Sequence, residues 1–126
     1  RASALAPPLP VVWHEDYSIP WPEKHRFPMR KFGDLAEQLL SDGIVASSTA
    51  FLRPEEPPHE WCLLAHDADY YWAFFDDKLE RQLARRLGFT QRPEHDALLR
   101  RTRLEVGGTV LTARLALERG IACNAA

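Results

Sequence analysis

Histidine and carboxylate side chains are the groups of this sequence that could bind a metal ion or move protons, and they are spread along the whole chain. The histidines are His14, His25, His59, His66 and His95. None belongs to an HExxH motif or to a Cys/His pattern with ligand spacing, whereas a zinc site needs three or four converging, well-oriented ligands. We therefore expect neither a catalytic group nor a metal site made from these residues alone.

His66 and His14 each stand beside more than one acidic residue in a short segment. His66 and Asp67 precede Asp69, a combination that would suit a metal or an acid–base pair. An aspartate just before an apolar run more often caps a helix, and we favour this interpretation for Asp67. His14 begins the acidic segment 14–16, which we interpret as the polar residues at the point where a strand ends.

Such side chains have to be held by folded elements, which the spacing of the apolar residues predicts. Residues 9–13 form a short apolar run rich in β-branched side chains, which is typical of a buried strand. Within residues 32–40 the apolar positions recur at i, i+3, i+4, i+7 and i+8. This spacing predicts a helix that starts near Arg30 and is closed by Gly43.

Shorter elements are predicted in the middle of the chain. A short strand is expected near residues 50–52. Proline at positions 57 and 58 can open a helix through Leu64, because proline suits a first helical turn. Asp67 can cap a helix through Phe75, and leucines at spacing four continue to Gly88. We interpret one stripe of aromatic residues as part of the core rather than as a ligand surface; it consists of Tyr70, Tyr71, Phe74 and Phe75.

A glycine pair near the end of the chain indicates close packing. Residues 93–101 predict a short helix, and residues 104–119 a longer one whose wide apolar face suits a helix laid on a sheet. Gly107 and Gly108 each destabilise a helix interior by about 1 kcal/mol relative to alanine, so we expect a close backbone approach there. After Gly120, residues 121–124 predict a buried strand. Strand, helix and strand in this order predict an α/β fold with a parallel sheet.

Composition disfavours several classes of protein. The 126 residues favour one compact unit, which we place at 9–126 behind a flexible arm at 1–8. A net charge of −2 disfavours direct nucleic-acid binding. No apolar run approaches the roughly 20 residues that span a bilayer. We expect a soluble protein, and two cysteines without CxxC spacing favour a reducing, intracellular compartment, which includes an organelle entered by a trimmed precursor.

Three segments resemble, in the right order, the histone deacetylase family, particularly its class IV-like and bacterial members. Residues 13–32, with the run Trp-His-Glu-Asp-Tyr and later His-Arg-Phe-Pro-Met, resemble the opening of the family domain. Residues 63–75 resemble its leucine-rich helix pair with His and Tyr, and residues 103–124 resemble its Gly-Gly-Thr helix and the central strand that follows. The resemblance spans nearly the whole chain but about the first third of a family domain.

The resemblance implies the N-terminal, mostly helical portion of an arginase/deacetylase-like parallel-sheet three-layer fold. It also implies a zinc-dependent amidohydrolase that acts on acyl-lysine. In relatives, a Gly-Gly-x-His-His segment follows the position of Asn124 almost at once, and the Asp and His metal ligands and a tyrosine come later. We therefore expect no cofactor in this chain, and zinc only in a full-length family member.

The resemblance also implies residues that line a product channel. By motif, Arg26 matches the arginine of an internal channel thought to pass acetate, and a guanidinium suits a carboxylate through paired hydrogen bonds. The alternative is that Arg26 only ties its loop to backbone carbonyls. Tyr17 and Trp21 are candidates for the same channel, although aromatic packing alone would also explain them. Gly107 and Gly108 match the family's glycine pair and have a packing role in either case.

Two hypotheses from different classes follow. The chain is the N-terminal segment of a zinc-dependent lysine deacetylase or deacylase, catalytically incomplete, and its partner is the remainder of its own domain. Alternatively, it is a deacetylase-derived, non-catalytic interaction or structural subunit of a larger assembly, in which another protein completes the sheet. Neither hypothesis involves direct nucleic-acid contact or a membrane span.

Overall fold

The computed structural model of the chain describes residues 8–88 and 94–126. Most of the predicted arm at 1–8, and the proline at position 93, lie outside these residues. Within them the chain is mostly helical, with a very small parallel sheet. These features confirm the predicted helical character and the predicted parallel pairing of strands.

The sheet joins three segments that are far apart in the sequence. Strand β1 (Val11–Val12) pairs in parallel with β2 (Cys123–Asn124), with Val12 opposite Asn124. On its other side, Val12 forms an isolated parallel bridge with Leu52. The Leu52 N–H donates to the carbonyl of Val11 at 2.9 Å. β1 is therefore the central strand, and the strand expected near 50–52 is reduced to one bridging residue.

The helices carry most of the fold. In the described residues they are α1 (Lys31–Ser41), α2 (His59–Leu63), α3 (Ala68–Phe75), α4 (Arg81–Arg86) and α5 (His95–Arg119), together with 3-10 turns at Glu15–Tyr17 and Ser48–Ala50. As predicted, Asp67 caps α3, because its carboxylate accepts the N–H of Tyr70 at 3.1 Å. The prediction of separate helices at 93–101 and 104–119 is wrong, since α5 runs through both segments.

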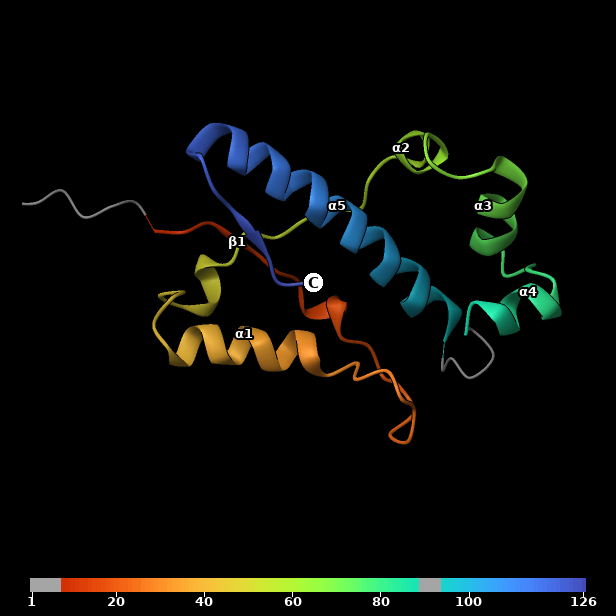
Figure 1. Cartoon of the computed structure of the whole chain (residues 1–126), viewed down its shortest axis with the longest axis horizontal. Coiled ribbons are helices and arrows are strands. Elements are labelled where there is room, and N and C mark those ends of the chain that lie inside the picture. Colours follow the sequence, from red (N-terminus) through yellow and green to blue (C-terminus); the bar gives the residue numbers. More distant parts are fainter. Residues whose placement is uncertain (1–7, 89–93) are drawn as a thin grey trace, which may run out of the picture.

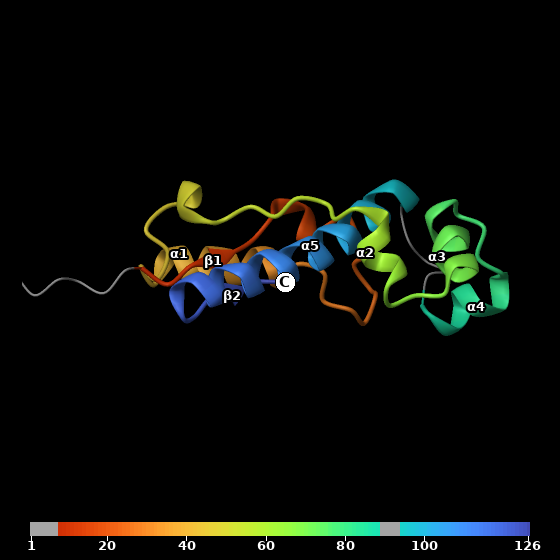
Figure 2. The ribbon, with the colours of Figure 1, turned by 90° about the horizontal axis from the view of Figure 1, so that it is seen from above.

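α1 and α5 lie on opposite sides of the strands (Figure 1). On the α1 side, Ala36 packs with Val11, Phe51 and Ala125 in one apolar cluster. A second cluster joins the turn after β1 to both helices and contains Tyr17, Met29, Phe32 and Leu104. Figure 2 shows that α2, α3 and α4 gather beside the N-terminal part of α5, away from the strands.

The C-terminal strand is shorter and more exposed than predicted. Gly120 ends α5 with φ +88, a left-handed value that favours glycine, and residues 121 and 122 stay outside the strand. Ile121 is 63% exposed and Cys123 is exposed, so the expectation of a buried strand at 121–124 is wrong. The physical reason is that β2 is an edge strand, with only β1 beside it among the described residues.

No helix within 8–88 or 94–126 is both long enough and apolar enough to cross a bilayer.

Candidate functional site

A cavity of about 270 Å³ lies between the proline-rich loop after the first turn and the start of α5. Its wall includes Trp21, His25 and Arg26 from the loop, and Leu98 and Arg101 from α5. A second cavity, of about 470 Å³, is formed by the loop itself and also has Trp21 and Arg26 in its wall. The structure therefore brings two of the three channel candidates together.

The two candidates differ in how they are held. Arg26 is exposed, and within the described residues it donates no hydrogen bond to a backbone carbonyl. Trp21 is half-buried and packs edge-on against His25, with ring centroids 5.3 Å apart. Its indole N–H is buried without a hydrogen-bond partner. A wall that contains a free guanidinium suits a small anion such as a carboxylate.

Arg101 is a cavity residue that the sequence reasoning missed. Its guanidinium is buried, and its Nε donates to the carbonyl of Tyr17 at 2.8 Å. Its two terminal nitrogens donate to the carboxylate of Glu105 at 3.0 and 2.7 Å. Burial raises the pKa of Glu105, and the charge of Arg101 opposes this shift. The signal available in the sequence was the i, i+4 spacing of an arginine and a glutamate.

The third channel candidate, Tyr17, occupies a different place. Its side chain is fully buried (0% exposed) and does not line the cavity that Trp21 and Arg26 share. The Tyr17 hydroxyl donates to Oδ1 of Asn124 at 3.1 Å. Burial raises the pKa of Tyr17 to about 12.

The glycine pair lies where α5 approaches two other segments. A Cβ at Gly107 would collide with the backbone carbonyl of Glu55. A Cβ at Gly108 would collide with the Tyr17 hydroxyl and would come within 3.0 Å of the Asn124 amide. Both positions are buried in α5. The lack of a side chain at each position is therefore what allows α5 to lie this close to its neighbours.

The acidic segment after β1 forms a 3-10 turn (Glu15–Tyr17) with His14 as its N-cap. His14 is buried, and its Nδ1 accepts the N–H of Asp16 at 3.0 Å. Burial has the largest effect on the pKa of His14 and lowers it. The charge of Glu15 raises this pKa, and the charge of Arg53 lowers it. This environment keeps the imidazole neutral at pH 7 and gives it a structural role.

Charged side chains connect this turn to α5. Arg100 donates to the carboxylate of Asp16 at 2.7 Å and to that of Glu56 at 2.8 Å. Arg103 donates to the other oxygen of Glu56 at 2.6 Å. This network connects the segments that follow β1 and Leu52 to α5, and both of its arginines are paired with carboxylates.

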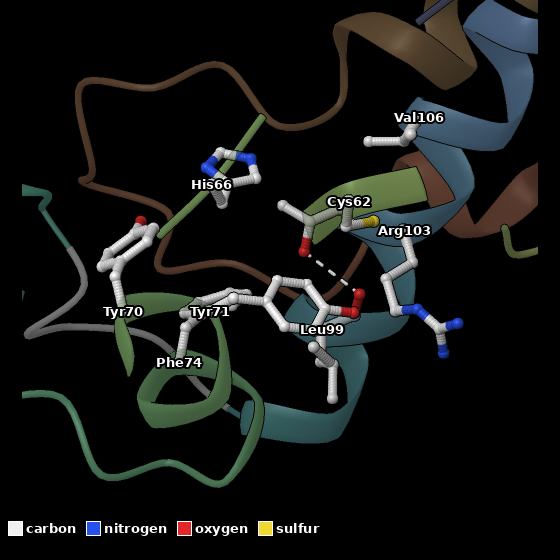
Figure 3. A pocket seen from close by; sticks show the side chains of 9 residues that line it. Cys62, His66, Tyr70, Tyr71, Phe74, Leu99, Arg103 and Val106 are labelled. Atoms are coloured by element: carbon white, nitrogen blue, oxygen red, sulfur yellow. Dashed lines mark hydrogen bonds between the residues drawn. The ribbon is translucent and has the colours of Figure 1, made fainter. Parts of the chain in front are cut away.

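The predicted aromatic stripe contributes to an apolar cavity of about 160 Å³ between α2, α3 and α5 (Figure 3). Tyr71 is buried, and its hydroxyl lies 2.8 Å from Nδ1 of His59. Burial raises the pKa of Tyr71. Tyr70 and Phe74 also line the cavity and are half-buried, so the stripe is partly core and partly cavity wall.

No three histidine, cysteine, aspartate or glutamate side chains within 8–88 and 94–126 come together in a way that could hold a metal ion. The described residues therefore do not fit the zinc site of the family that the sequence resembles.

No family model matches the chain. An uncharacterized protein of the cyanobacterium Picosynechococcus sp. is 44% identical to it over 118 residues, which are 94% of this chain and 38% of that protein. The chain thus spans less than two fifths of the length of this relative.

Proposed function

We propose that this chain is the N-terminal segment of a histone-deacetylase-like, zinc-dependent lysine deacetylase or deacylase. We propose that the complete domain has an arginase/deacetylase-like three-layer fold, and that α1, the strands and α5 form one end of it. The observation that carries the proposal is the cavity with Arg26 in its wall, at the position where the sequence resemblance puts a channel arginine. The parallel pairing of β1 with β2 supports the proposed fold.

In the proposed enzyme, the described residues handle the product rather than the reaction. Arg26 is exposed and unengaged, so its guanidinium is free to pair with the carboxylate of acetate. Trp21 is half-buried and contributes its ring to the same wall. Arg101 contributes positive charge to the same wall, but its hydrogen bonds to Glu105 and Tyr17 keep it in place.

One observation favours the alternative of a non-catalytic interaction subunit. The outer edge of β2 is exposed, and an unpaired strand edge is a template for a partner strand. The coding sequence after Ala126 separates the two hypotheses. A Gly-Gly-x-His-His segment supports the enzyme, whereas an immediate stop codon supports the interaction subunit.

The proposal is tested by comparing the isolated chain with the longer product of its reading frame. After dialysis, we expect about one zinc per molecule and chelator-sensitive hydrolysis of a fluorogenic acetyl-lysine peptide from the longer protein only. A longer protein that neither binds zinc nor hydrolyses acyl-lysine peptides would show that the proposal is wrong. Stoichiometric zinc and turnover in the isolated chain would show that the site had been misplaced.

A further inference from the structure

The imidazole of His14 is a buried titratable group that is surrounded by charged side chains. His14 is only 6% exposed. The charged groups that face its ring come from three segments: Glu15 and Asp16 from its own turn, Arg53 from the segment 53–56, and Arg100 from α5. A change in the charge of this one ring is therefore felt by three parts of the fold at once.

The neutral ring is the N-cap of the turn Glu15–Tyr17. Its Nδ1 accepts the N–H of Asp16 at 3.0 Å, so the proton of the neutral imidazole lies on Nε2. Nε2 is 3.2 Å from Nη2 of Arg53, which places a positive charge against the ring. Burial lowers the pKa of His14, and the charge of Arg53 acts in the same direction. Both the cap and its surroundings thus favour the neutral form.

The carboxylates beside the ring are the groups that hold the other two segments to the turn. Glu15 pairs with Arg53. Asp16 accepts Nε of Arg100 at 2.7 Å, and Arg100 also donates to Glu56 at 2.8 Å. The turn, the segment 53–56 and α5 are therefore joined by ion pairs that begin next to the imidazole.

Protonation of the ring would disturb all of these contacts. A proton on Nδ1 turns the cap acceptor into a donor that faces the N–H of Asp16, so the cap is lost. The same nitrogen lies 3.6 Å from Oε2 of Glu15 and 3.8 Å from Oδ2 of Asp16, close enough for the imidazolium to attract both carboxylates. Each carboxylate that turns to the ring weakens its pair with Arg53 or Arg100, and the imidazolium itself repels Arg53.

We propose that His14, Glu15, Asp16 and Arg53 form an acid-sensitive latch, which protonation of the His14 ring opens by releasing the segment 53–56 from the turn. Every group of this latch belongs to the described residues, so the latch does not depend on the proposed enzyme activity.

The direction of the pH dependence follows from the lowered pKa of His14. In the unfolded chain the ring takes up its proton near about pH 6.5, whereas in the folded protein it does so only at lower pH. The stability that the latch contributes is therefore complete above the pKa of the unfolded state. It is lost as the pH falls toward the pKa of the folded state.

A pH titration of the 126-residue chain, followed by NMR from about pH 8 to about pH 5, tests the latch directly. The ring signals of His14 should titrate with a pKa below that of a free imidazole. The side-chain Nε–H signal of Arg100 and the backbone amide signals of Asp16 and Arg53 should shift with the same midpoint, because their contacts change when the ring is charged.

His14→Asn separates the cap from the charge. The asparagine oxygen can still accept the N–H of Asp16, but the side chain takes up no proton in this pH range. The common midpoint at Arg53 and Arg100 should therefore disappear. His25→Asn is the matched control, since Nδ1 of His25 also accepts an N–H two residues further on, that of Phe27, at 3.1 Å. It should leave the common midpoint unchanged.

Two charge variants should move the pKa of His14 in opposite directions. Arg53→Gln should raise this pKa, because it removes the positive charge beside Nε2 and frees Glu15 to pair with the ring. Glu15→Gln should lower it, because it removes the nearest negative charge. Both substitutions change exposed side chains, so the fold should be retained.

Several results would overturn the latch. A His14 pKa at or above that of free imidazole would show that the folded state does not favour the neutral ring. Titration of His14 without matching shifts at Arg53 and Arg100 would leave it a histidine that only caps the turn. The same midpoint in His14→Asn would assign the shifts to a carboxylate. If His14→Asn does not fold, the wild-type titration and the two charge variants decide the question.

Discussion

The guanidinium groups of Arg26 and Arg101 line one cavity, but their surroundings give them different physical roles. Arg101 is 7% exposed and pairs with the carboxylate of Glu105, so its removal would leave a half-buried carboxylate and the carbonyl of Tyr17 without this partner. Arg26 is exposed and has no carboxylate partner among the described residues. At the residue scale, Arg26 can therefore be changed without disturbing the fold, whereas Arg101 cannot.

Arg26→Ala, made in the longer protein, should lower turnover of an acetyl-lysine peptide while leaving the Tm nearly unchanged. Surface substitutions usually change stability by less than about 0.5 kcal/mol, whereas loss of a channel cation slows product escape. Lys24→Ala is the control, because Lys24 is an exposed cation of the same loop and lines neither cavity. A sharp fall in Tm with normal turnover per folded molecule would instead assign Arg26 to holding the loop.

Some residue roles could be predicted from local spacing, and others could not. Asp67 caps α3 because the cap and the N–H it accepts are three residues apart. The partnership of Tyr17 with Asn124 joins residues 107 positions apart, and nothing in the local sequence indicates it. Only the glycine at position 108 indicates this contact in the sequence. It predicts that another segment approaches the helix closely, but it does not identify the side chain that does so.

At the scale of elements, α5 shows where periodicity was misread. The sequence predicts one helix that ends near residue 101 and another that begins at residue 104, and yet no glycine or proline separates them. Leu98, Arg101 and Leu104 lie on one buried face, and the guanidinium of Arg101 is accepted there because Glu105 and a carbonyl pair with it. Because an arginine is normally exposed, the buried position of Arg101 could not be recognised in the sequence as part of one continuous helix face.

The other helices followed from the sequence because helix formation depends on residues three or four apart. α1 begins within two residues of its predicted start and contains the predicted apolar stripe. The sheet was harder to predict, since its pairing depends on contacts across more than 100 residues. Only the parallel direction of the two strands could be predicted, from the order of strand, helix and strand in the sequence.

Gly107→Ala tests the close approach of α5 to the segment that follows Leu52. The new methyl group would collide with the carbonyl of Glu55, which belongs to the backbone and cannot rotate away. Despite the better helix propensity of alanine, we expect the free energy of unfolding to fall by about 1 to 3 kcal/mol, as for other overpacked sites. Urea denaturation followed by circular dichroism measures this change.

Gly33→Ala in α1 is the matched control for Gly107→Ala. A Cβ at Gly33 would lie 3.6 Å from Oγ of Ser18, an ordinary contact. Alanine there should be neutral or should stabilise the protein by up to about 1 kcal/mol. Equal stability of the two alanine variants would contradict the close approach.

At the scale of the whole molecule, the α1 side of the strands is better covered than their outer edge. Val11 and Phe51 are buried against α1. In contrast, β2 is exposed at Cys123, and the segment before it exposes Ile121 by 63% and Leu117 by 89%. An exposed strand edge beside apolar side chains favours association with another chain or with a further segment.

The isolated chain should therefore self-associate, stay loosely packed, or require a partner that covers β2. At about 25 cal/mol per Å² of apolar surface, a few hundred Å² left in water forgo several kcal/mol, comparable with the stability of a small domain. Size-exclusion chromatography with light scattering should show a mass that rises with concentration, and amide exchange should show weak protection at Cys123. Ile121→Lys should reduce the association, while Leu64→Lys, which changes an equally apolar exposed residue after α2, should not. A sharp monomer with strong protection throughout 121–124 would show that the edge needs no partner.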